Sequence, residues 1–140
     1  MSTRLMDYFN RTPRIGVLGT ASKDGKVNVA VFESPQMIDE KTVVVALGQN
    51  RTLANLQENP NAVYMIVKPA ETGVEEWKGI RVSMRMKECT TSGARLDAYR
   101  KEIAQIAGDE VAATIQATAT FEIGEVRPIV DMGQGWENSI

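Results

Sequence analysis

Residues 47–60 read Leu-Gly-Gln-Asn-Arg-Thr-Leu-Ala-Asn-Leu-Gln-Glu-Asn-Pro, and they follow a valine-rich apolar run at residues 42–47. That run is too short for a helix and rich in β-branched residues, so it predicts a buried strand. Gly48 then marks a turn, Asn50 is a good helix N-cap, and Asn59-Pro60 is a stop signal. The stretch therefore predicts a buried strand followed by one short helix of about ten residues.

The charge at the start of this helix is unusual. The first turn of a helix exposes unpaired N–H groups and a partial positive charge, which usually attract Asp or Glu. This chain places Arg51 there instead and has no carboxylate between Glu40 and Glu58. A phosphate could collect the backbone N–H groups, the Arg51 guanidinium and the Thr52 hydroxyl. The alternative is a capped surface helix with a solvated arginine.

Composition limits the function classes. The chain has 140 residues, 43% of them hydrophobic, and a formal net charge of -2. This size predicts a single domain spanning residues 1–140, and the absence of a dense basic block argues against nucleic-acid binding. Cys89 is the only cysteine, which excludes an internal disulfide and favours a reducing compartment. Because no run is apolar enough for a membrane span or a signal peptide, we expect a cytoplasmic protein with no membrane partner.

Histidine does not occur in the sequence. A Ser-His-Asp or Cys-His relay therefore cannot be built, and the commonest transition-metal ligand is missing. A zinc site would need several thiolates, and the chain has one. We accordingly assign no catalytic side chain and no metal site, and expect a cofactor to carry any chemistry.

Short alternating segments predict several more strands. Residues 14–20 and 26–32 form a hairpin around Ser22-Lys23-Asp24-Gly25, and the valines of its second arm alternate with other residues as in a half-buried strand. Further strands are expected at residues 62–67, 80–87, 112–123 and 126–130. Together with two main helices they predict about seven strands in a small antiparallel barrel, mainly β with α.

Residues 80–87 show the clearest alternation. Apolar side chains point one way, while Arg81, Ser83, Arg85 and Lys87 point the other. This basic face is either solvated or directed at an acidic partner or ligand. Nucleic-acid binding through Arg81, Arg85 and Lys87 would be a further function, one that would show steep salt dependence.

The second main helix is expected at residues 92–107, ending at Gly108. Its stripe of Leu96, Tyr99, Ile103 and Ile106 has the spacing of an apolar face, which belongs to a core far more often than to a ligand site. The glycine-rich tail at residues 131–140 carries Trp136. That ring is expected either to dock on a second subunit or to fold back on its own core.

The order of these parts resembles the FMN-binding split barrel of pyridoxine 5'-phosphate oxidases and small bacterial FMN-binding proteins. The resemblance rests on the Asp24-Gly25 turn, the buried strand at residues 43–47, Asn50-Arg51-Thr52 and Asn59-Pro60, and it spans most of residues 13–123. It implies a six- to seven-stranded antiparallel split barrel with two main helices. It also implies FMN as the cofactor and a homodimer with the flavin at the subunit interface.

The resemblance further implies a set of site residues. Arg51 and Thr52 would hold the FMN phosphate with help from the amides near Gln49 and Asn50, and residues 30–34 and 46–48 would bracket the ribityl chain and ring through backbone groups. The cofactor-binding residues would be Ala30, Val31, Phe32, Glu33, Ser34, Ala46, Leu47, Gly48, Gln49, Asn50, Arg51 and Thr52. The Phe32 ring would add an aromatic face or pack in the core, and Trp77 or Trp136 of a partner subunit would complete the pocket.

Two departures from the family pattern bear on the reaction. Thr52 stands where the oxidases usually carry a second basic residue, and the chain lacks histidine, so vitamin B6 oxidation is not expected. We instead expect a homodimeric flavoprotein that carries electrons or acts as a small flavin-dependent reductase, with an unidentified redox partner or substrate. The alternative is a non-enzymatic binding module, a dimeric sensor or scaffold that holds another phosphorylated ligand, such as a deazaflavin, or none.

Overall fold

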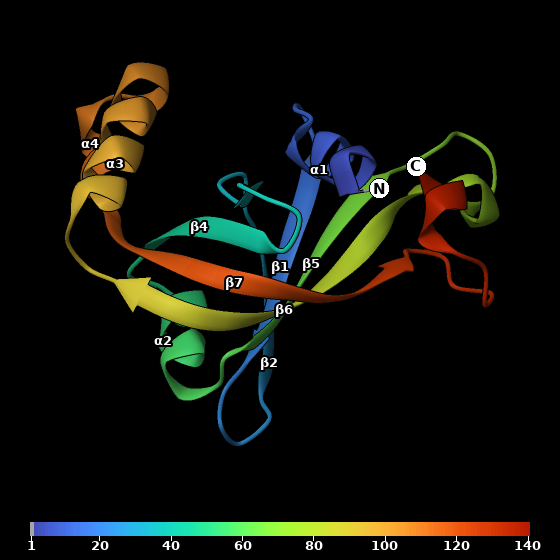
Figure 1. Cartoon of the computed structure of the whole chain (residues 1–140), viewed down its shortest axis with the longest axis horizontal. Coiled ribbons are helices and arrows are strands. Elements are labelled where there is room, and N and C mark those ends of the chain that lie inside the picture. Colours follow the sequence, from blue (N-terminus) through green and yellow to red (C-terminus); the bar gives the residue numbers. More distant parts are fainter. Residues whose placement is uncertain (1) are drawn as a thin grey trace.

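The computed structural model describes residues 2–140, which form one seven-stranded antiparallel sheet with four α-helices (Figure 1). The strands lie in the order β2-β1-β5-β6-β7-β4-β3. Their bounds are β1 (Ile15–Ala21), β2 (Val27–Val31), β3 (Gln36–Met37), β4 (Thr42–Gly48), β5 (Asn61–Lys68), β6 (Lys78–Thr90) and β7 (Ile115–Pro128). The expected mainly β architecture with helices, a split barrel, is confirmed.

The helices are α1 (Ser2–Asn10), α2 (Arg51–Glu58), α3 (Ala94–Ala107) and α4 (Asp109–Ala113), with short 3-10 turns η1 (Val74–Glu76) and η2 (Trp136–Ser139). The two predicted main helices correspond to α2 and α3. Helix α1 lies across one end of β1 and β5 (Figure 1), and its Phe9 ring is fully buried 5.3 Å from the Tyr64 ring. The barrel interior is filled by large side chains such as Leu18, Tyr64 and Phe121.

The β1–β2 hairpin forms as predicted, but its valines face outward. Gly25 takes a positive φ of 86° in the turn, which suits glycine. Val29 is 70% exposed, and Val27 and Val31 are exposed as well, so the valines are the outer side of this half-buried strand. The reason lies in the register, which pairs Ala30 with the buried Leu18 and so turns Ala30, and not the valines, toward the interior.

Strand β7 is longer than predicted and begins later. Residues 109–113 form α4, so the predicted strand at 112–123 was wrong at its start. Apart from that start, the predicted strands at 112–123 and 126–130 form a single strand, because the strand continues through Gly124. A register shift opposite it, between the Val82–Val126 and Met84–Ile123 pairs, absorbs the extra residue as a β-bulge.

Helix α3 packs less closely than its apolar stripe predicts. Leu96 is fully buried, but Tyr99 and Ile103 are half-buried and Ile106 is 76% exposed. The prediction that this stripe belongs to the core was therefore wrong beyond Leu96. The helix is also held by Arg100, whose Nε and Nη2 donate to the Ile115 carbonyl over 2.8 and 2.6 Å. Figure 1 shows α3 and α4 together at the end of the sheet where β6 ends and β7 begins.

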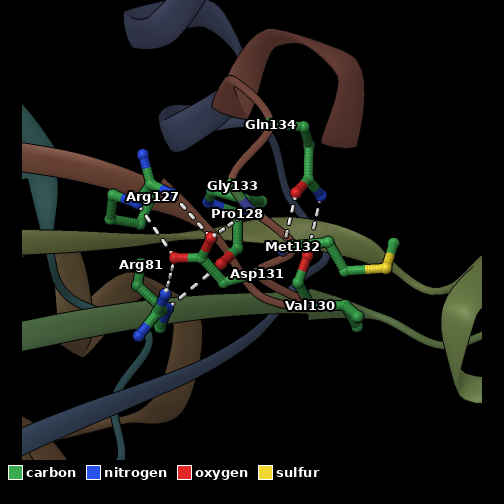
Figure 2. A network of polar contacts seen from close by, with 8 residues as sticks. All are labelled: Arg81, Arg127, Pro128, Val130, Asp131, Met132, Gly133 and Gln134. Carbon is green, nitrogen blue, oxygen red and sulfur yellow. Dashed lines mark hydrogen bonds and ion pairs between the residues drawn. The ribbon is translucent and has the colours of Figure 1, made fainter.

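The C-terminal tail folds back on its own chain. Trp136 packs against the core, and Lys78 Nζ donates to the Asn138 carbonyl over 3.1 Å. Figure 2 shows how Asp131 anchors the start of this tail: one carboxylate oxygen accepts from Arg81 Nη2 at 2.8 Å, and the other accepts from Arg127 Nη2 at 2.5 Å. Of the two expectations for Trp136, the structure supports packing on its own core.

The basic face of β6 is partly neutralised by these contacts. Arg81 pairs with Asp131, and Lys87 Nζ lies 3.3 Å from Glu122 Oε1. Arg85 Nη1 is 3.4 Å from Asn61 Oδ1. This arrangement favours the alternative in which the basic face of β6 is simply solvated, and it gives no support to nucleic-acid binding.

Candidate functional site

The start of α2 is built as the sequence predicts. Asn50 has an extended backbone and caps the helix, its Oδ1 accepting from the Leu53 N–H over 2.9 Å. Leu53 and Leu56 are buried, which turns this face of the helix into the barrel. No acidic residue occupies the first turn. The positive end of the α2 dipole is therefore not neutralised within its own helix.

Arg51 and Thr52 have different surroundings at this helix start. The Thr52 residue is 1% exposed, whereas Arg51 is exposed. Within residues 2–140 the structure records no hydrogen bond or ion pair for the Arg51 guanidinium, and no acceptor for the backbone N–H groups of Arg51 and Thr52. Gln49 is exposed beside them. The end of β4 thus leads into a cluster of uncommitted N–H donors and one cation.

A single hydroxyl brings together the two segments expected to bracket the cofactor. Ser34 Oγ donates to the Ala46 carbonyl over 3.0 Å and accepts from the Ala46 N–H over 3.1 Å. Strand β3 pairs with β4 only at Val43 and Val44, so the Ser34 hydroxyl takes the place of a neighbouring strand farther along β4. Ser34 and Ala46, one from each segment, therefore lie side by side.

The side chains of β4 itself are interior. Ala46 and Leu47 are buried, and Gly48 is half-buried beside the exposed Asn50. Leu47 belongs to the hydrophobic core. The Ala46 and Leu47 side chains are therefore turned away from any ligand, and a contact here would have to use the backbone.

Phe32 is committed to the barrel. Its carbonyl accepts from Tyr64 Oη over 2.6 Å, its N–H donates to the Gly16 carbonyl over 2.9 Å, and its ring packs against the core. The core alternative for this ring is thus supported, and its backbone groups are already used. Ala30 and Val31 pair with β1 on one edge of β2, whose other edge is the end of the sheet.

Arg14 organises the loop after β2, and the sequence analysis missed it. Its guanidinium donates to the carbonyls of Phe9, Glu33 (2.8 Å) and Pro35 (2.5 Å), and lies over the Phe9 and Tyr64 rings at 5.5 and 5.2 Å. Because its polar partners are backbone carbonyls, which every residue carries, no side-chain motif could have revealed this role.

An apolar face covers the outside of the β2-β1-β5 part of the sheet. Val27, Val29 and Val31 lie on the same face of the sheet as Ile15 of β1 and Val63 of β5, with Gly19 between Val29 and Val63, and all five are exposed. Contiguous apolar surface of this kind marks a protein or ligand interface. We refer to these five residues as the valine face.

Other kinds of site find little support in the described part of the chain. Among residues 2–140, no three His, Cys, Asp or Glu side chains cluster closely enough to hold a metal ion. None of the helices there combines the length and apolar character that crossing a membrane requires. Trp77 is half-buried at the end of η1.

A family model described as pyridoxamine 5'-phosphate oxidase matches residues 3–128. The chain belongs to this family. A search of curated proteins found no match. Membership in the pyridoxamine 5'-phosphate oxidase family agrees with the fold and with the order of motifs around Arg51.

Solved structures show the same fold at low identity. An FMN-binding protein from Syntrophomonas wolfei subsp. wolfei has a TM-score of 0.74 at 23% identity, covering 91% of this chain and 84% of that one. An F420 reductase has a TM-score of 0.62 at 12% identity, covering 86% of this chain and 94% of that one. HutZ, the heme storage protein from Vibrio cholerae, has a TM-score of 0.62 at 15% identity, covering 89% and 92%. Because these members of one fold are named for different ligands, the fold alone does not select the ligand.

Proposed function

We propose that this member of the pyridoxamine 5'-phosphate oxidase family is an FMN-binding flavoprotein. Arg51, Thr52 and the first N–H groups of α2 would hold the phosphate. The single observation that supports this most is the cluster of uncommitted donors at the start of α2, which has no acidic residue in its first turn. A phosphate needs several such donors and a cation, so the residues present fit the group.

The rest of the proposed site follows from the Ser34–Ala46 contact. Residues 30–34 and 46–48 meet there, and the exposed Gln49 and Asn50 connect them with the phosphate end. We expect the backbone near these segments to contact the flavin ring. When bound, FMN supplies hydride or electron transfer, while the chain contributes binding, orientation and control of access.

The reaction is proposed as electron transfer or reduction of a small molecule. Vitamin B6 oxidation is not proposed, because the chain has no histidine and carries Thr52 in place of a second basic residue. The free Cys89 is compatible with the reducing cytoplasm, where we place the protein.

We further propose that the protein works as a homodimer. Its valine face exposes five apolar side chains on adjoining strands, although monomeric proteins rarely expose large contiguous apolar patches. A second copy offers an equally apolar face, and most soluble oligomers are symmetric dimers of this kind. Dimerisation would bury the valine face.

The alternative is a non-enzymatic module holding another phosphorylated ligand, such as a deazaflavin. The same donor cluster at Arg51 would hold its phosphate. One of the solved structures with this fold is named an F420 reductase. A histidine-ligated heme is disfavoured, because the chain contains no histidine.

Identification of the bound ligand tests the proposal. The protein is purified without added cofactor, denatured, and the released small molecule is identified by mass spectrometry and visible absorbance. We expect FMN and a yellow protein. A deazaflavin would favour the alternative, and a colourless protein that also fails to bind added FMN would overturn the flavoprotein proposal.

A further inference from the structure

A groove of about 660 Å³ separates α3 from the loop that follows β2. Glu33, Ser34 and Pro35 line one side, and Tyr99, Ile103 and Ile106 line the other. This volume lies within the roughly 300–1,000 Å³ typical of small-molecule sites. The groove also touches the proposed cofactor site, because Ser34 lines it and hydrogen-bonds to Ala46.

The apolar wall of the groove is the part of α3 that the core does not use. Leu96 and Arg100 attach the helix to the barrel, whereas Tyr99, Ile103 and Ile106 face the groove and remain half-buried or exposed. Removing such apolar side chains from water is favourable in free energy, and here that gain is not made. An apolar ligand in the groove would recover it.

The charges of the groove favour a cation. Glu33 and Glu102 are exposed carboxylates on its two sides, and among the lining residues from the described part of the chain Arg14 is the only Lys or Arg. The Arg14 guanidinium already donates to three backbone carbonyls, those of Phe9, Glu33 and Pro35. It is therefore poorly placed to bind a carboxylate ligand, whereas neither glutamate carboxylate has a hydrogen bond or ion pair with the described residues 2–140.

We propose that this groove binds a small molecule with an apolar, ring-sized body and a cationic amine. The ring would lie against Tyr99, Ile103 and Ile106, and the amine would lie toward Glu102 and Glu33. That this molecule is the partner of the flavin rests on the proposed function, since Ser34 connects the groove with the cofactor site. Binding to the groove itself does not depend on the flavin.

The first test compares three probes of similar shape on the full chain: phenethylamine, phenethyl alcohol and hydrocinnamate. Their dissociation constants are measured by protein-observed NMR titration. We expect the cationic phenethylamine to bind best and the anionic hydrocinnamate worst, with shifts concentrated at residues 33–36 and 99–106. Equal binding of the amine and the carboxylate, or shifts elsewhere, would overturn the proposal.

Two variants with matched controls locate the contacts. Ile106→Ser should weaken phenethylamine binding about fivefold through lost apolar contact, while Val111→Ser, on α4 outside the groove, should not. Glu102→Gln should reduce the preference for the amine over the alcohol roughly threefold, as for an exposed ion pair, while Glu110→Gln should not. All four positions are exposed, so the fold is retained. Unchanged binding by Ile106→Ser would contradict the assignment.

A third experiment separates the groove from the flavin. Phenethylamine should perturb the visible absorbance of the FMN-loaded protein, and Arg51→Ala should remove the flavin while leaving probe binding in place. Probe binding without any FMN binding would refute the proposed function but keep the groove. FMN binding without probe binding would refute the groove. Probe binding that leaves the flavin spectrum unchanged would refute their adjacency.

Discussion

Tyr64 donates a hydrogen bond from its phenolic oxygen to the backbone carbonyl of Phe32 over 2.6 Å. The two residues come from β5 and the end of β2, which are not neighbours in the sheet. Gly16 allows this approach, because a Cβ there would lie 1.8 Å from the Tyr64 oxygen. The contact fixes where the chain leaves β2, and with it the position of residues 33 and 34.

Tyr64→Phe should lower the free energy of unfolding by about 1 kcal/mol, since it removes one buried hydrogen bond. Chemical denaturation measures the change. Tyr8→Phe is the control, because the structure records no hydrogen bond for that hydroxyl within residues 2–140. An equal effect of the two substitutions would contradict the role of the Phe32 contact.

The same tyrosine predicts alkaline sensitivity. Burial raises the pKa of Tyr64 from 10.0 to about 12, partly offset by the nearby Arg14 charge. The unfolded chain therefore loses this proton first, so the contribution is complete below pH 10 and is lost as the pH rises toward 12. Denaturation at several pH values should show a steeper loss of stability across this window in the wild type than in Tyr64→Phe. Parallel curves would contradict it.

Arg51→Ala should weaken FMN binding by about 1.5 to 3 kcal/mol, the scale of a hydrogen bond to a charged group. Flavin fluorescence quenching on titration of the ligand-free protein measures the affinity. Arg95→Ala removes an exposed arginine from α3 and should bind FMN normally. If both variants bind equally well, Arg51 does not hold the phosphate.

Val29→Asp should convert the proposed homodimer into a monomer, because it places a charge at the centre of the valine face. Sedimentation velocity or light scattering on a sizing column measures the mass. Val74→Asp is a matched control: Val74 is also exposed but lies in η1, outside that face. A monomeric wild type, or a dimeric Val29→Asp variant, would contradict the proposed interface.

Acid should loosen the C-terminal tail through Asp131. Its hydrogen bond from Arg127 holds the pKa of this carboxyl at about 2, below the ordinary 3.8. The contribution is therefore present above pH 3.8 and is lost as the pH falls toward 2. Trp136 fluorescence, followed in a Trp77→Phe background, should report the loss of packing.

Asp131→Asn should weaken tail packing already at neutral pH and flatten this acid transition. Asp109→Asn, on α4, should behave like the parent protein. An unchanged transition in Asp131→Asn would mean that the two arginine contacts in Figure 2 do not hold the tail.

Local pattern was sufficient for β4 and α2, because an apolar run, an N-cap and Asn-Pro each act on a few adjacent residues. The alternation in β2 correctly predicted a strand, but period two does not say which of two faces is interior. That choice was made by the register with β1, where Ala30 pairs with Leu18. Likewise the period of α3 predicted a helix with an apolar stripe, but what covers the stripe depends on packing distant in sequence.

The candidate site was predictable to a similar extent. The capping role of Asn50, next to Arg51, could be predicted from the sequence because capping depends on a few adjacent residues. Two other contacts could not be predicted: that of Ser34 with Ala46, and those of Arg14 with three carbonyls. Their acceptors are backbone groups, which every residue carries. β7 was divided wrongly for a related reason, since the bulge that carries the strand past Gly124 involves residues of β6.

The contact between the loop after β2 and strand β4 depends on one oxygen atom, that of the Ser34 hydroxyl. On its other edge, β4 pairs with β7 over many residues, so neighbouring pairs keep the two strands together if one hydrogen bond is lost. At Ala46 both backbone groups rely on the same hydroxyl. Loss of this one atom, as in Ser34→Ala, would therefore break both bonds to Ala46 together, and the loop carrying Glu33 would then depend on its contacts with Arg14 and Tyr64.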